Sequence, residues 1–516
     1  MSATADAVLG IDLGTSVVKA GVYGFAGTIY ATASHPVALH RSQQGRTEQD
    51  LDEFYRAAAA ATRQCLSGAG IAPERIGAIA VAGQMAGVGV VDAEHRPLAP
   101  YDSWLDGRCS EIVDELSDTV RRRITAVAGC PPTISIGPKM AWWRRHEPRL
   151  CENAAAFVTA AGYVTGRAGG LSGREAFIDP SYLHFTSVAD VERGQWDDDL
   201  VAAVGVDRTL LPRIVESTSI VAELTAQAGI DFGLPAGVPV AAGCGDTAAS
   251  VLGSGVTQAG QAFDIAGTAA VFGLCLPLYA PDTENSTLMT MRSPLPGRWY
   301  SLAYVAGAGQ VIEWICREVL GHAELGEAAY ANLADAAATV AAGSDGVVLS
   351  PHFGGRIAPV APSMRGSVIG LSPTHGRSHL ARATLESIAF EYRRYAEIMR
   401  RSAPAWPGHE VIGTGGGSRL GVWNQIKADV LATLYRPVVG VETGTRGAAL
   451  VAMAALGHDR LELDAAAWGP VVEPDPLNQA TYDVAYARYR RWSDLLDEGY
   501  RTEAAHPHDL RTGERT

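Results

Sequence analysis

The residue types best suited to phosphate chemistry stand near the start of the chain, in Asp12-Leu13-Gly14-Thr15-Ser16. They close the apolar run Ala7 to Asp12, which predicts a strand ending in a tight turn. Such a turn aims backbone N–H groups and a hydroxyl at one point and can cradle a phosphate. A bare carboxylate would repel that phosphate, so the chemical use of Asp12 would be to hold a divalent cation. The same residues also fit a plain hairpin whose Asp bonds its own backbone.

Two further glycine turns stand in the second half of the chain. Gly267-Thr268 follows the run Phe263 to Ala266, and Gly415-Gly416-Gly417-Ser418 follows Val411-Ile412 and precedes a predicted helix. Glycines at such turns let a phosphate or a planar ring approach the main chain. Neither turn is a P-loop, because no Lys stands in the required register. Each alone fits an ordinary turn, whereas three glycine turns, each after a strand, favour a nucleotide.

A third kind of candidate is Asp246 in Gly245-Asp246-Thr247. It follows the predicted strand Pro239 to Gly243 and opens an Ala-rich predicted helix. The carboxyl ends of strands are where α/β sheets place their ligands, so this carboxylate could accept a proton from an attacking hydroxyl. An Asp in this place is also a good helix N-cap, and position alone favours neither interpretation.

Directional polar groups beside flat apolar ones suit a polyhydroxylated ligand. Two segments combine them: Gln84-Met85, after the predicted strand Ile76 to Ala82, and Trp104-Leu105-Asp106-Gly107-Arg108. Taken singly, each segment fits an exposed turn or the start of a helix equally well. Together they indicate a sugar or a polyol as the ligand.

The elements that must position these residues indicate the α/β class. Three runs, at 7–12, 17–23 and 28–39, predict an antiparallel meander, and a helix at 51–66 and a buried strand at 76–82 follow. We also predict a loop-rich segment at 179–199 and strands at 346–350 and 409–414. Further helices are predicted at residues 108–127, 138–146, 378–400, 422–434 and 447–456.

The pattern of the N-terminus returns in the middle of the chain. Gly10 to Ser16 and Phe263 to Ala269 both read as an apolar run with an Asp, then Gly-Thr and a small residue, and a second apolar run follows each. A short internal similarity of this kind can report a duplicated architecture. It predicts two like domains, divided near 250–256, each presenting a Gly-Thr hairpin to one shared cleft.

Composition limits the possible functions. The chain has 516 residues, 47% of them hydrophobic and 19% charged, with a formal net charge of −14. This acidic balance argues against broad binding to nucleic acid or to anionic membranes. We expect neither a secretory signal nor a spanning segment, and the seven scattered Cys residues predict reduced thiols and a cytoplasmic protein.

Several motifs together resemble one family. Asp12 to Ser16 with Lys19 is similar to the first phosphate motif of the actin-like ATPase superfamily. The chain over about residues 7–495 resembles the FGGY carbohydrate kinases, most of all their xylulose kinase branch. The motifs, in the family's order, are Trp104-x-Asp106-x-Arg108, Gly243-x-Gly245-Asp246, Gly267-Thr268, Gly307-Ala308-Gly309, a C-terminal signature (Gly366 to Leu371, His379-Leu380, Ala383 to Glu386) and Gly415-Gly416-Gly417.

The resemblance implies an α/β fold of two ribonuclease H-like domains flanking a central cleft. Residues 1–254 would bind the sugar, residues 255–500 mainly the nucleotide, and residues 501–516 would form a polar tail. The donor would be ATP with Mg²⁺, and the partner a small sugar or polyol. A homodimer is a further expectation.

The resemblance also implies roles for single residues. Asp246 would be the catalytic base and would contact the sugar, while Asp12 would hold the metal. The phosphates and the nucleotide would meet Gly14, Thr15, Ser16, Lys19, Gly267, Thr268, Gly309, Gly416 and Gly417. The sugar would meet Gln84, Met85, Trp104, Asp106 and Arg108.

The chain departs from the family pattern at several points. Xylulose kinases usually read Gly-Gln-Met-His-Gly where this chain has Ala86, which removes an imidazole from the sugar side. Asp264 and Ala269 stand where small hydroxyl residues are common. The stretch Pro138 to Trp143 matches the N-terminal signature only in part.

The expected function is therefore an ATP-dependent kinase of a ketopentose such as D-xylulose. Another pentulose, a deoxy sugar or a four- to six-carbon polyol stays open as the acceptor. An actin-like ATPase acting on a protein partner is the alternative of another class, but it would not need Trp104, Asp106, Arg108 and Asp246. A catalytically silent sugar-binding relative would not need both Asp12 and Asp246.

Overall fold

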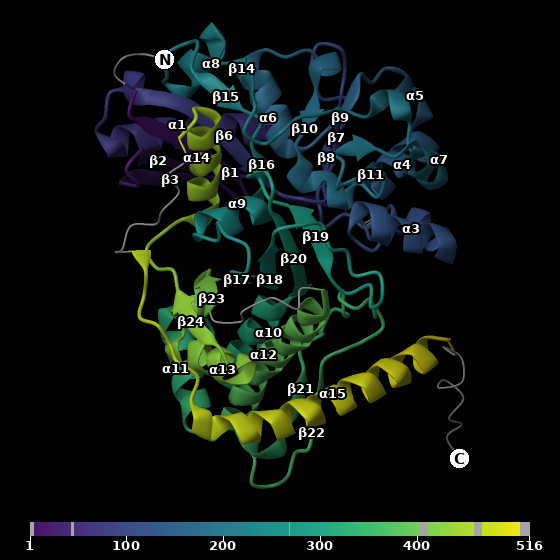
Figure 1. The fold of residues 1–516 in the computed structure, drawn as a ribbon, viewed down its shortest axis with the longest axis vertical. Coiled ribbons are helices and arrows are strands. Elements are labelled where there is room, and N and C mark those ends of the chain that lie inside the picture. The colour runs from purple at the N-terminus through teal and green to yellow at the C-terminus, as the bar shows by residue number, and fades with distance from the viewer. Residues whose placement is uncertain (1–4, 43–45, 268, 403–409, 459–466, 506–516) are drawn as a thin grey trace.

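The computed structural model describes residues 5–42, 46–267, 269–402, 410–458 and 467–505, and the chain folds into two bodies (Figure 1). The upper body in that view holds the first half of the chain. The lower one holds most of the second half. Each is built on a mixed sheet with helices packed on it, as the α/β prediction requires.

The first sheet has the order β14-β15-β6-β1-β2-β3, with β16 paired to β6. Its first three strands are the predicted antiparallel meander, and β1 runs parallel to β6. The bounds are β1 (Ala7–Leu13), β2 (Val17–Gly24), β3 (Ile29–Pro36), β6 (Ile76–Gly83), β14 (Ile220–Glu223), β15 (Pro239–Ala241) and β16 (Cys244–Gly245).

The second sheet repeats this plan in the order β19-β20-β18-β17-β23-β24. β17 and β18 form an antiparallel hairpin and β17 runs parallel to β23, just as β1 pairs with β2 and β6. The bounds are β17 (Ala262–Ala266), β18 (Ala270–Leu276), β19 (Met289–Arg292), β20 (Trp299–Val305), β23 (Glu410–Thr414) and β24 (Leu434–Pro437).

Two helices from different halves of the chain cover one face of the first sheet. α14 (Thr443–Ala455) packs on β1 and β6 and against α9 (Asp246–Gly253), so the second half of the chain helps to close the first core. Glycines permit the close approach. A Cβ at Gly447 would lie 1.9 Å from the carbonyl oxygen of Ala249, and one at Gly253 would lie 1.9 Å from that of Thr443.

The opposite face of the first sheet is covered by α1 (Leu51–Ala69), which packs on β2 and β3. Its start follows from the sequence, because the side chain of Asp50 accepts a hydrogen bond from the N–H of Asp52, and its end is marked by Gly70 in the left-handed conformation. Further helices and short strands of this body are β4 (His40–Arg41), β5 (Thr47–Gln49), β7 (Gly89–Val91), β8 (Tyr101–Asp102), α2 (Ser110–Asp114), α3 (Asp118–Ala128), α4 (Ile136–His146), α5 (Pro148–Glu152), β9 (Ala156–Val158), α6 (Ala160–Gly169), β10 (Phe177–Ile178), the 3₁₀ helix η3 (Pro180–Phe185), β11 (Ala189–Asp190), β12 (Gln195–Trp196), α7 (Asp198–Val204), β13 (Arg213–Ile214) and α8 (Ala226–Phe232).

The second sheet is flanked by the remaining helices of the lower body. α12 runs through the middle of this body and packs on β18 and β20, while the long α15 crosses its lower edge (Figure 1). The bounds are α10 (Ala308–Trp314), α11 (Glu327–Ala338), β21 (Val348–Ser350), β22 (Ser367–Ile369), α12 (Arg377–Ser402), α13 (Gly421–Leu431) and α15 (Pro476–Ala505).

Three predicted helices differ from the structure. The predicted helix at 108–127 is wrong as one piece, because Ser117 caps a new helix by accepting from the N–H of Val120, which separates α2 from α3. The helix predicted at 422–434 ends at Leu431, since Ala432 takes a left-handed conformation and Leu434 already belongs to β24. The helix predicted from residue 447 begins earlier, at Thr443.

The seven Cys residues are all free thiols, and six of them are buried. Within the described ranges, no helix is both long and apolar enough to cross a membrane. The predicted boundary at residues 254–255 falls between the last strand of the first sheet and the first strand of the second. The boundary stays a prediction, because α14 comes from the second half of the chain but packs on the first sheet.

Candidate phosphoryl-transfer site

Three parallel strands of the first sheet bring the predicted acidic residues to one edge. Leu13 of β1 lies opposite Gly83 of β6, and Gly83 lies opposite Gly245 of β16. Asp12, Gln84 and Asp246 therefore stand next to the ends of three adjacent strands. The N–H of Gln84 also donates to the carbonyl oxygen of Leu13 at 3.0 Å, which ties the first two strand ends together.

Asp12 is half-buried and is not saturated by its surroundings. Its Oδ1 is buried and has no hydrogen-bond partner in the described part of the chain. Burial and, to a smaller extent, the negative charge of Asp246 raise the pKa of Asp12 to about 7, while Lys19 opposes the shift. The alternative of a plain hairpin in which this Asp bonds its own backbone does not fit an oxygen left without a donor. A buried carboxylate oxygen without a donor, beside a second carboxylate, suits a divalent cation.

Asp246 is the first residue of α9, and the N-cap position belongs to Gly245. The alternative that Asp246 is an N-cap is therefore wrong. Its Oδ1 accepts from the N–H of Thr247 at 2.6 Å and from the Thr247 hydroxyl at 3.2 Å. Burial raises the pKa of Asp246 to about 6, and the two bonds from Thr247 limit that rise. At neutral pH the carboxylate is charged, yet basic enough to take a proton.

The turn between β1 and β2 presents Gly14, Thr15 and Ser16. The N–H of Gly14 donates to the carbonyl oxygen of Val17 at 3.1 Å, and the Thr15 hydroxyl accepts from Trp104 Nε1 at 2.9 Å. Lys19 lies opposite Asp12 on β2 and pairs with Glu442 at 2.5 Å. Glu442 directly precedes α14, so this pair links the second half of the chain to β2, next to the turn between β1 and β2.

Gln84, Met85 and Trp104 lie around the same strand ends. Gln84 is 1% exposed, and its Nε2 donates to Gln49 Oε1 at 2.8 Å. Met85 packs on Gly245, where a Cβ would lie 2.7 Å from the Met85 sulfur. The Trp104 side chain is 42% exposed although its indole N–H reaches Thr15, so it presents an apolar face beside the turn.

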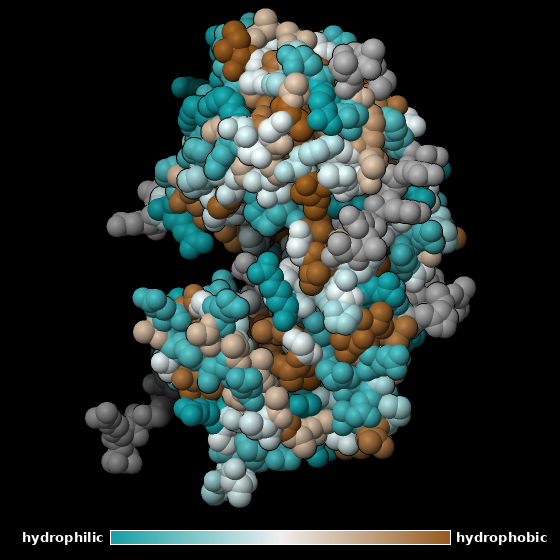
Figure 2. Space-filling model, turned by 90° about the vertical axis from the view of Figure 1, so that its left-hand side faces the viewer, coloured by the Kyte–Doolittle hydropathy of each residue, from teal (hydrophilic) through white to brown (hydrophobic). Residues whose placement is uncertain are grey.

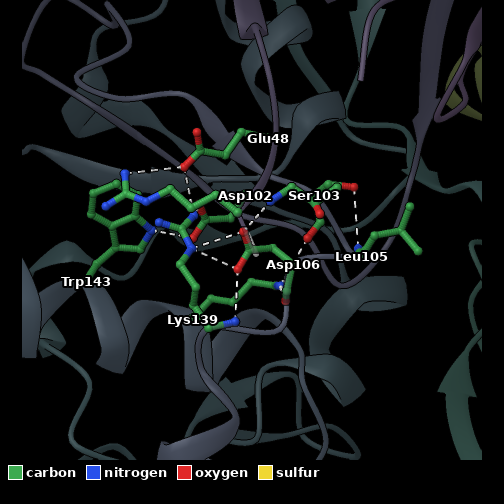
Figure 3. A network of polar contacts seen from close by, with 10 residues as sticks. Glu48, Asp102, Ser103, Leu105, Asp106, Lys139 and Trp143 are labelled. Atoms are coloured by element: carbon green, nitrogen blue, oxygen red, sulfur yellow. Dashed lines mark hydrogen bonds and ion pairs between the residues drawn. The ribbon is translucent and has the colours of Figure 1, made fainter. Parts of the chain in front are cut away.

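Asp106 belongs to a polar network with Glu48, Asp102 and Lys139 (Figure 3), and Arg108 pairs with several of its members. Arg108 pairs with Asp106 at 2.9 Å, with Glu48 at 2.9 Å and with Asp102. Burial alone would raise the pKa of Asp106, but the hydrogen bonds from Arg108 and from the N–H of Thr47 hold it below its ordinary value. Asp106 is only 1% exposed. Both residues brace the segment that carries Trp104; their direct contact with a sugar stays a prediction.

Two residues of this site escaped the sequence analysis. Lys139 of α4 donates to the carbonyl oxygens of Ser103 at 3.0 Å and Asp106 at 2.6 Å. Gln49 of β5 joins Gln84 to the carbonyl oxygen of Thr15. Neither has a local signal, because each acts through a segment far away in the sequence. Lys139 stands within the stretch that matches the family only in part.

The glycine turns of the second half gather at one edge of the second sheet. Gly267 follows β17, Gly415 follows the neighbouring β23, and Gly307 to Gly309 follow β20, whose last residue lies opposite the first of β18. Gly415 has φ 86°, and a Cβ there would lie 2.5 Å from the carbonyl oxygen of Ala266. Gly416 borders open space. Gly417 packs against Trp423. The predicted nucleotide residue Thr268 lies outside the described residues.

The repeated Asp of the second hairpin does not join this edge. Asp264 is fully buried in the core, where its carboxylate meets Lys427 at 2.5 Å, Tyr435 at 2.7 Å and Tyr392 at 2.6 Å. Burial lowers the pKa of Lys427, and the charge of Asp264 opposes that change. This pair supports the second sheet from inside.

Comparison with known proteins agrees with this arrangement. Residues 7–253 match the N-terminal domain of the FGGY family of carbohydrate kinases, and residues 263–456 match its C-terminal domain. The xylulose kinase of Bacillus subtilis is 26% identical over 508 residues, which cover 95% of this chain and 97% of that protein. The glycerol kinase of Dechloromonas aromatica is 30% identical over 478 residues, covering 89% and 91%.

Solved structures agree in fold. The xylulose kinase from Rhodospirillum rubrum superposes with a TM-score of 0.85 at 28% identity, over 96% of this chain and 100% of that one. A glycerol kinase from Plasmodium falciparum, solved with ADP, has a TM-score of 0.80 at 18% identity. The expected two-domain ribonuclease H-like fold of the actin-like ATPase superfamily is thereby confirmed. The chain belongs to the FGGY family of carbohydrate kinases and is a phosphotransferase that uses an alcohol group as acceptor.

Proposed function

We propose that this protein transfers the γ-phosphate of ATP to a hydroxyl of a ketopentose such as D-xylulose, with Asp246 as the general base. The observation that carries the proposal is the pair of carboxylates, Asp12 and Asp246, at the ends of the two strands that flank β6, beside a Gly-Thr turn. Xylulose kinases among the relatives at 26–28% identity support the acceptor class.

In this proposal Asp246 holds the acceptor hydroxyl and takes its proton as the oxygen attacks the γ-phosphorus in line. Its pKa of about 6 suits that step, because the carboxylate is mostly ionised at pH 7 and is a stronger base than an ordinary Asp side chain. Positioning and charge stabilisation, not covalent chemistry, supply most of the rate in phosphoryl transfer. Gln84 and Trp104 lie where they can orient the acceptor.

The residues present fit a magnesium ion at Asp12. Its Oδ1 is buried without a donor, and the nearby Asp246 adds a second negative charge. A Mg²⁺ bound through this oxygen would supply positive charge to the phosphates. Nowhere in the described ranges do three or more His, Cys, Asp or Glu side chains gather to hold an ion, so water and phosphate oxygens would complete such a site.

ATP would lie against the glycine turns at Gly267, Gly309 and Gly415 to Gly417. Gly416 has open space where a side chain would stand, so a ligand can come close to the main chain there. Gly415 has a positive φ of 86°, which glycine adopts without strain. Figure 2 shows the surface hollowed between the upper and lower bodies, where these turns and the first sheet's edge would share a ligand. Lys19, Gly14, Thr15 and Ser16 would meet the phosphates from the other side.

The identity of the acceptor is the most specific part of the proposal. Ala86 has φ 62°, a conformation that costs an Ala side chain strain, and it offers no polar group where xylulose kinases usually carry His. Losing that imidazole leaves room and removes one contact to a hydroxyl. Another pentulose, a deoxy sugar or a four- to six-carbon polyol are therefore the competing acceptors, and glycerol kinases are among the relatives.

The test is a coupled assay of ADP release across ketoses and polyols, with purified wild type and the variant Asp246→Asn. We expect one acceptor to stimulate ADP release and Asp246→Asn to lose about 10³-fold in kcat while still binding ATP. The matched control is Asp198→Asn, whose side chain is 82% exposed and pairs with Arg208. Hydrolysis that no sugar stimulates, but a protein partner does, would favour the actin-like ATPase alternative.

A further inference from the structure

One buried tyrosine lies behind the strand ends of the proposed site. Tyr182 belongs to η3 and is 1% exposed. Its single O–H proton is shared between two acceptors, the carbonyl oxygens of Gly83 at 2.8 Å and Cys244 at 3.1 Å. Gly83 is the last residue of β6, and Cys244 is the first of β16. One side chain therefore holds two neighbouring strand ends.

A second contact comes from the residues beside Tyr182. The hydroxyl of Ser181 accepts from the N–H of Gly245 at 2.8 Å and donates to Asp179 Oδ1 at 2.6 Å. The same Asp179 oxygen accepts from the N–H of Ser181 at 2.9 Å and from the Ser217 hydroxyl at 2.9 Å. Three donors fix this buried carboxylate, so Ser181 has little freedom to move.

The residues held by these hydrogen bonds directly precede the two residues of the proposed site. Gln84 follows Gly83, and Asp246 follows Gly245. The ladder between β6 and β16 is short, because Cys244 and Gly245 are its only two residues, opposite Ala82 and Gly83. Two ladder pairs give little resistance to separation of the strand ends, so the hydrogen bonds from η3 add restraint on this spacing.

We propose that Tyr182 is a positioning residue: its hydroxyl sets the distance between the acceptor-orienting Gln84 and the base Asp246, and Ser181 with Asp179 holds Gly245 in place behind them. This inference rests on the proposed function. It adds a layer of support behind that site, because all three residues are buried. Its effect is on the geometry of attack, to which phosphoryl transfer is sensitive, since a misplacement of 1 Å can cost about 10²-fold in rate.

The test compares Tyr182→Phe with Tyr55→Phe in the full-length protein, using the acceptor that stimulates the wild type most. Tyr55 is a fitting control because it is also buried in the first body and also loses one hydrogen bond, to Asp231 at 2.9 Å. For Tyr182→Phe we expect kcat to fall about tenfold with the KM for ATP unchanged, because the base is then held less exactly in line with the attacking hydroxyl. Tyr55→Phe should keep its kcat.

A pH profile separates positioning from a general loss of stability. In Tyr182→Phe the plateau of kcat should fall while its acid limb keeps the midpoint of the wild type, because Asp246 itself is intact. Equal losses of Tm in both variants with an unchanged kcat at 25 °C would overturn the proposal. Should Tyr182→Phe fail to fold, Ser181→Ala carries the same measurement and the same two outcomes.

The double variant Ser181→Ala with Tyr182→Phe gives an independent check. Both side chains restrain the same strand end, so their effects on kcat should be less than multiplicative. Fully multiplicative losses would mean that they act separately and would contradict a shared role. If the wild type shows no acceptor-dependent turnover at all, the proposed function fails; an active wild type beside an undiminished Tyr182→Phe refutes only the positioning role.

Discussion

The hairpin of β1 and β2 and the hairpin of β17 and β18 have the same architecture but use their aspartates in opposite ways. Asp12 stands two residues before Gly14, whereas Asp264 stands three residues before Gly267. Because strand side chains alternate between faces, this offset of one residue sends the two carboxylates to opposite sides of their sheets. Asp12 keeps an oxygen without a donor, while Asp264 is saturated by Lys427, Tyr392 and Tyr435.

The difference teaches that similar residues in a repeated motif have different roles when their parity differs. The position two residues before the turn glycine is Asp12 in the first hairpin and Ile265 in the second. The charge of the second hairpin therefore serves the core. We expect the two hairpins to respond to the same substitution in different properties, one in activity and the other in stability.

Within the two hairpins, the largest expected effect comes from Asp12→Asn. Under the proposed mechanism this change removes the charge that would hold a divalent cation, so kcat should fall about 10²- to 10³-fold. The measurement is ADP release at saturating ATP and acceptor, repeated over a range of Mg²⁺ concentration. The comparison would break if Asp12→Asn kept its full rate.

Asp264→Asn should act on stability instead. Removing one partner of a buried pair leaves Lys427 without its counter-ion, which costs about 3–5 kcal/mol of unfolding free energy. Chemical denaturation measures the loss, and kcat per folded molecule should stay near that of the wild type. A full rate loss without a change in denaturation midpoint would place Asp264 in the chemistry and contradict its assignment to the core.

Replacing both members of that pair sharpens the point. Asp264→Leu with Lys427→Met removes both buried charges, and apolar side chains of similar size often restore or exceed the original stability. We expect the double variant to recover at least about 2 kcal/mol relative to Asp264→Asn. A double variant as unstable as the single one would show that the tyrosine hydroxyls, left without Asp264, dominate the cost.

The first hairpin should also make the stability of the protein depend on pH. The pKa of Asp12 is about 7 in the folded protein and near its ordinary value in the unfolded chain. The folded state therefore binds this proton more tightly, and the resulting contribution to the free energy of unfolding is fully present below pH 4 and is lost as the pH rises through 7. At pH 8 Asp12→Asn should therefore be more stable than the wild type by about 1–2 kcal/mol, after allowance for solvent screening. At pH 4 the two should coincide. Denaturation curves at both pH values check this.

The smallest effect is expected at the exposed pair of Lys19 and Glu442. Both side chains are well exposed, at 39% and 46%, so either Lys19→Ala or Glu442→Gln should change the unfolding free energy by less than about 1 kcal/mol. If Lys19 meets the phosphates, Lys19→Ala should also raise the KM for ATP about fivefold, which corresponds to about 1 kcal/mol. Glu442→Gln is the matched control and should leave that KM nearly unchanged.

Much of the fold follows from the sequence, because the meander, α1 and β6 have strong local patterns that the structure confirms. The edge that carries Asp12, Gln84 and Asp246 was also predictable, since each residue directly follows or ends an apolar run. The role of Asp264 was not, because it depends on a partner, Lys427, that is 163 residues away. Gln49, Lys139 and Tyr182 escaped for the same reason: they act on strand ends and turns to which only the folded chain brings them.

The placement of α14 has a consequence for how the protein is made. While the ribosome is still translating the second half, the face of β1 and β6 that α14 will cover has no partner, and Val8, Ala78 and Ala80 remain open to water there. The first body thus stays unfinished until residue 455 has emerged from the exit tunnel. A fragment that stops near residue 254 should be prone to aggregation, and adding a peptide spanning α14 should rescue its solubility.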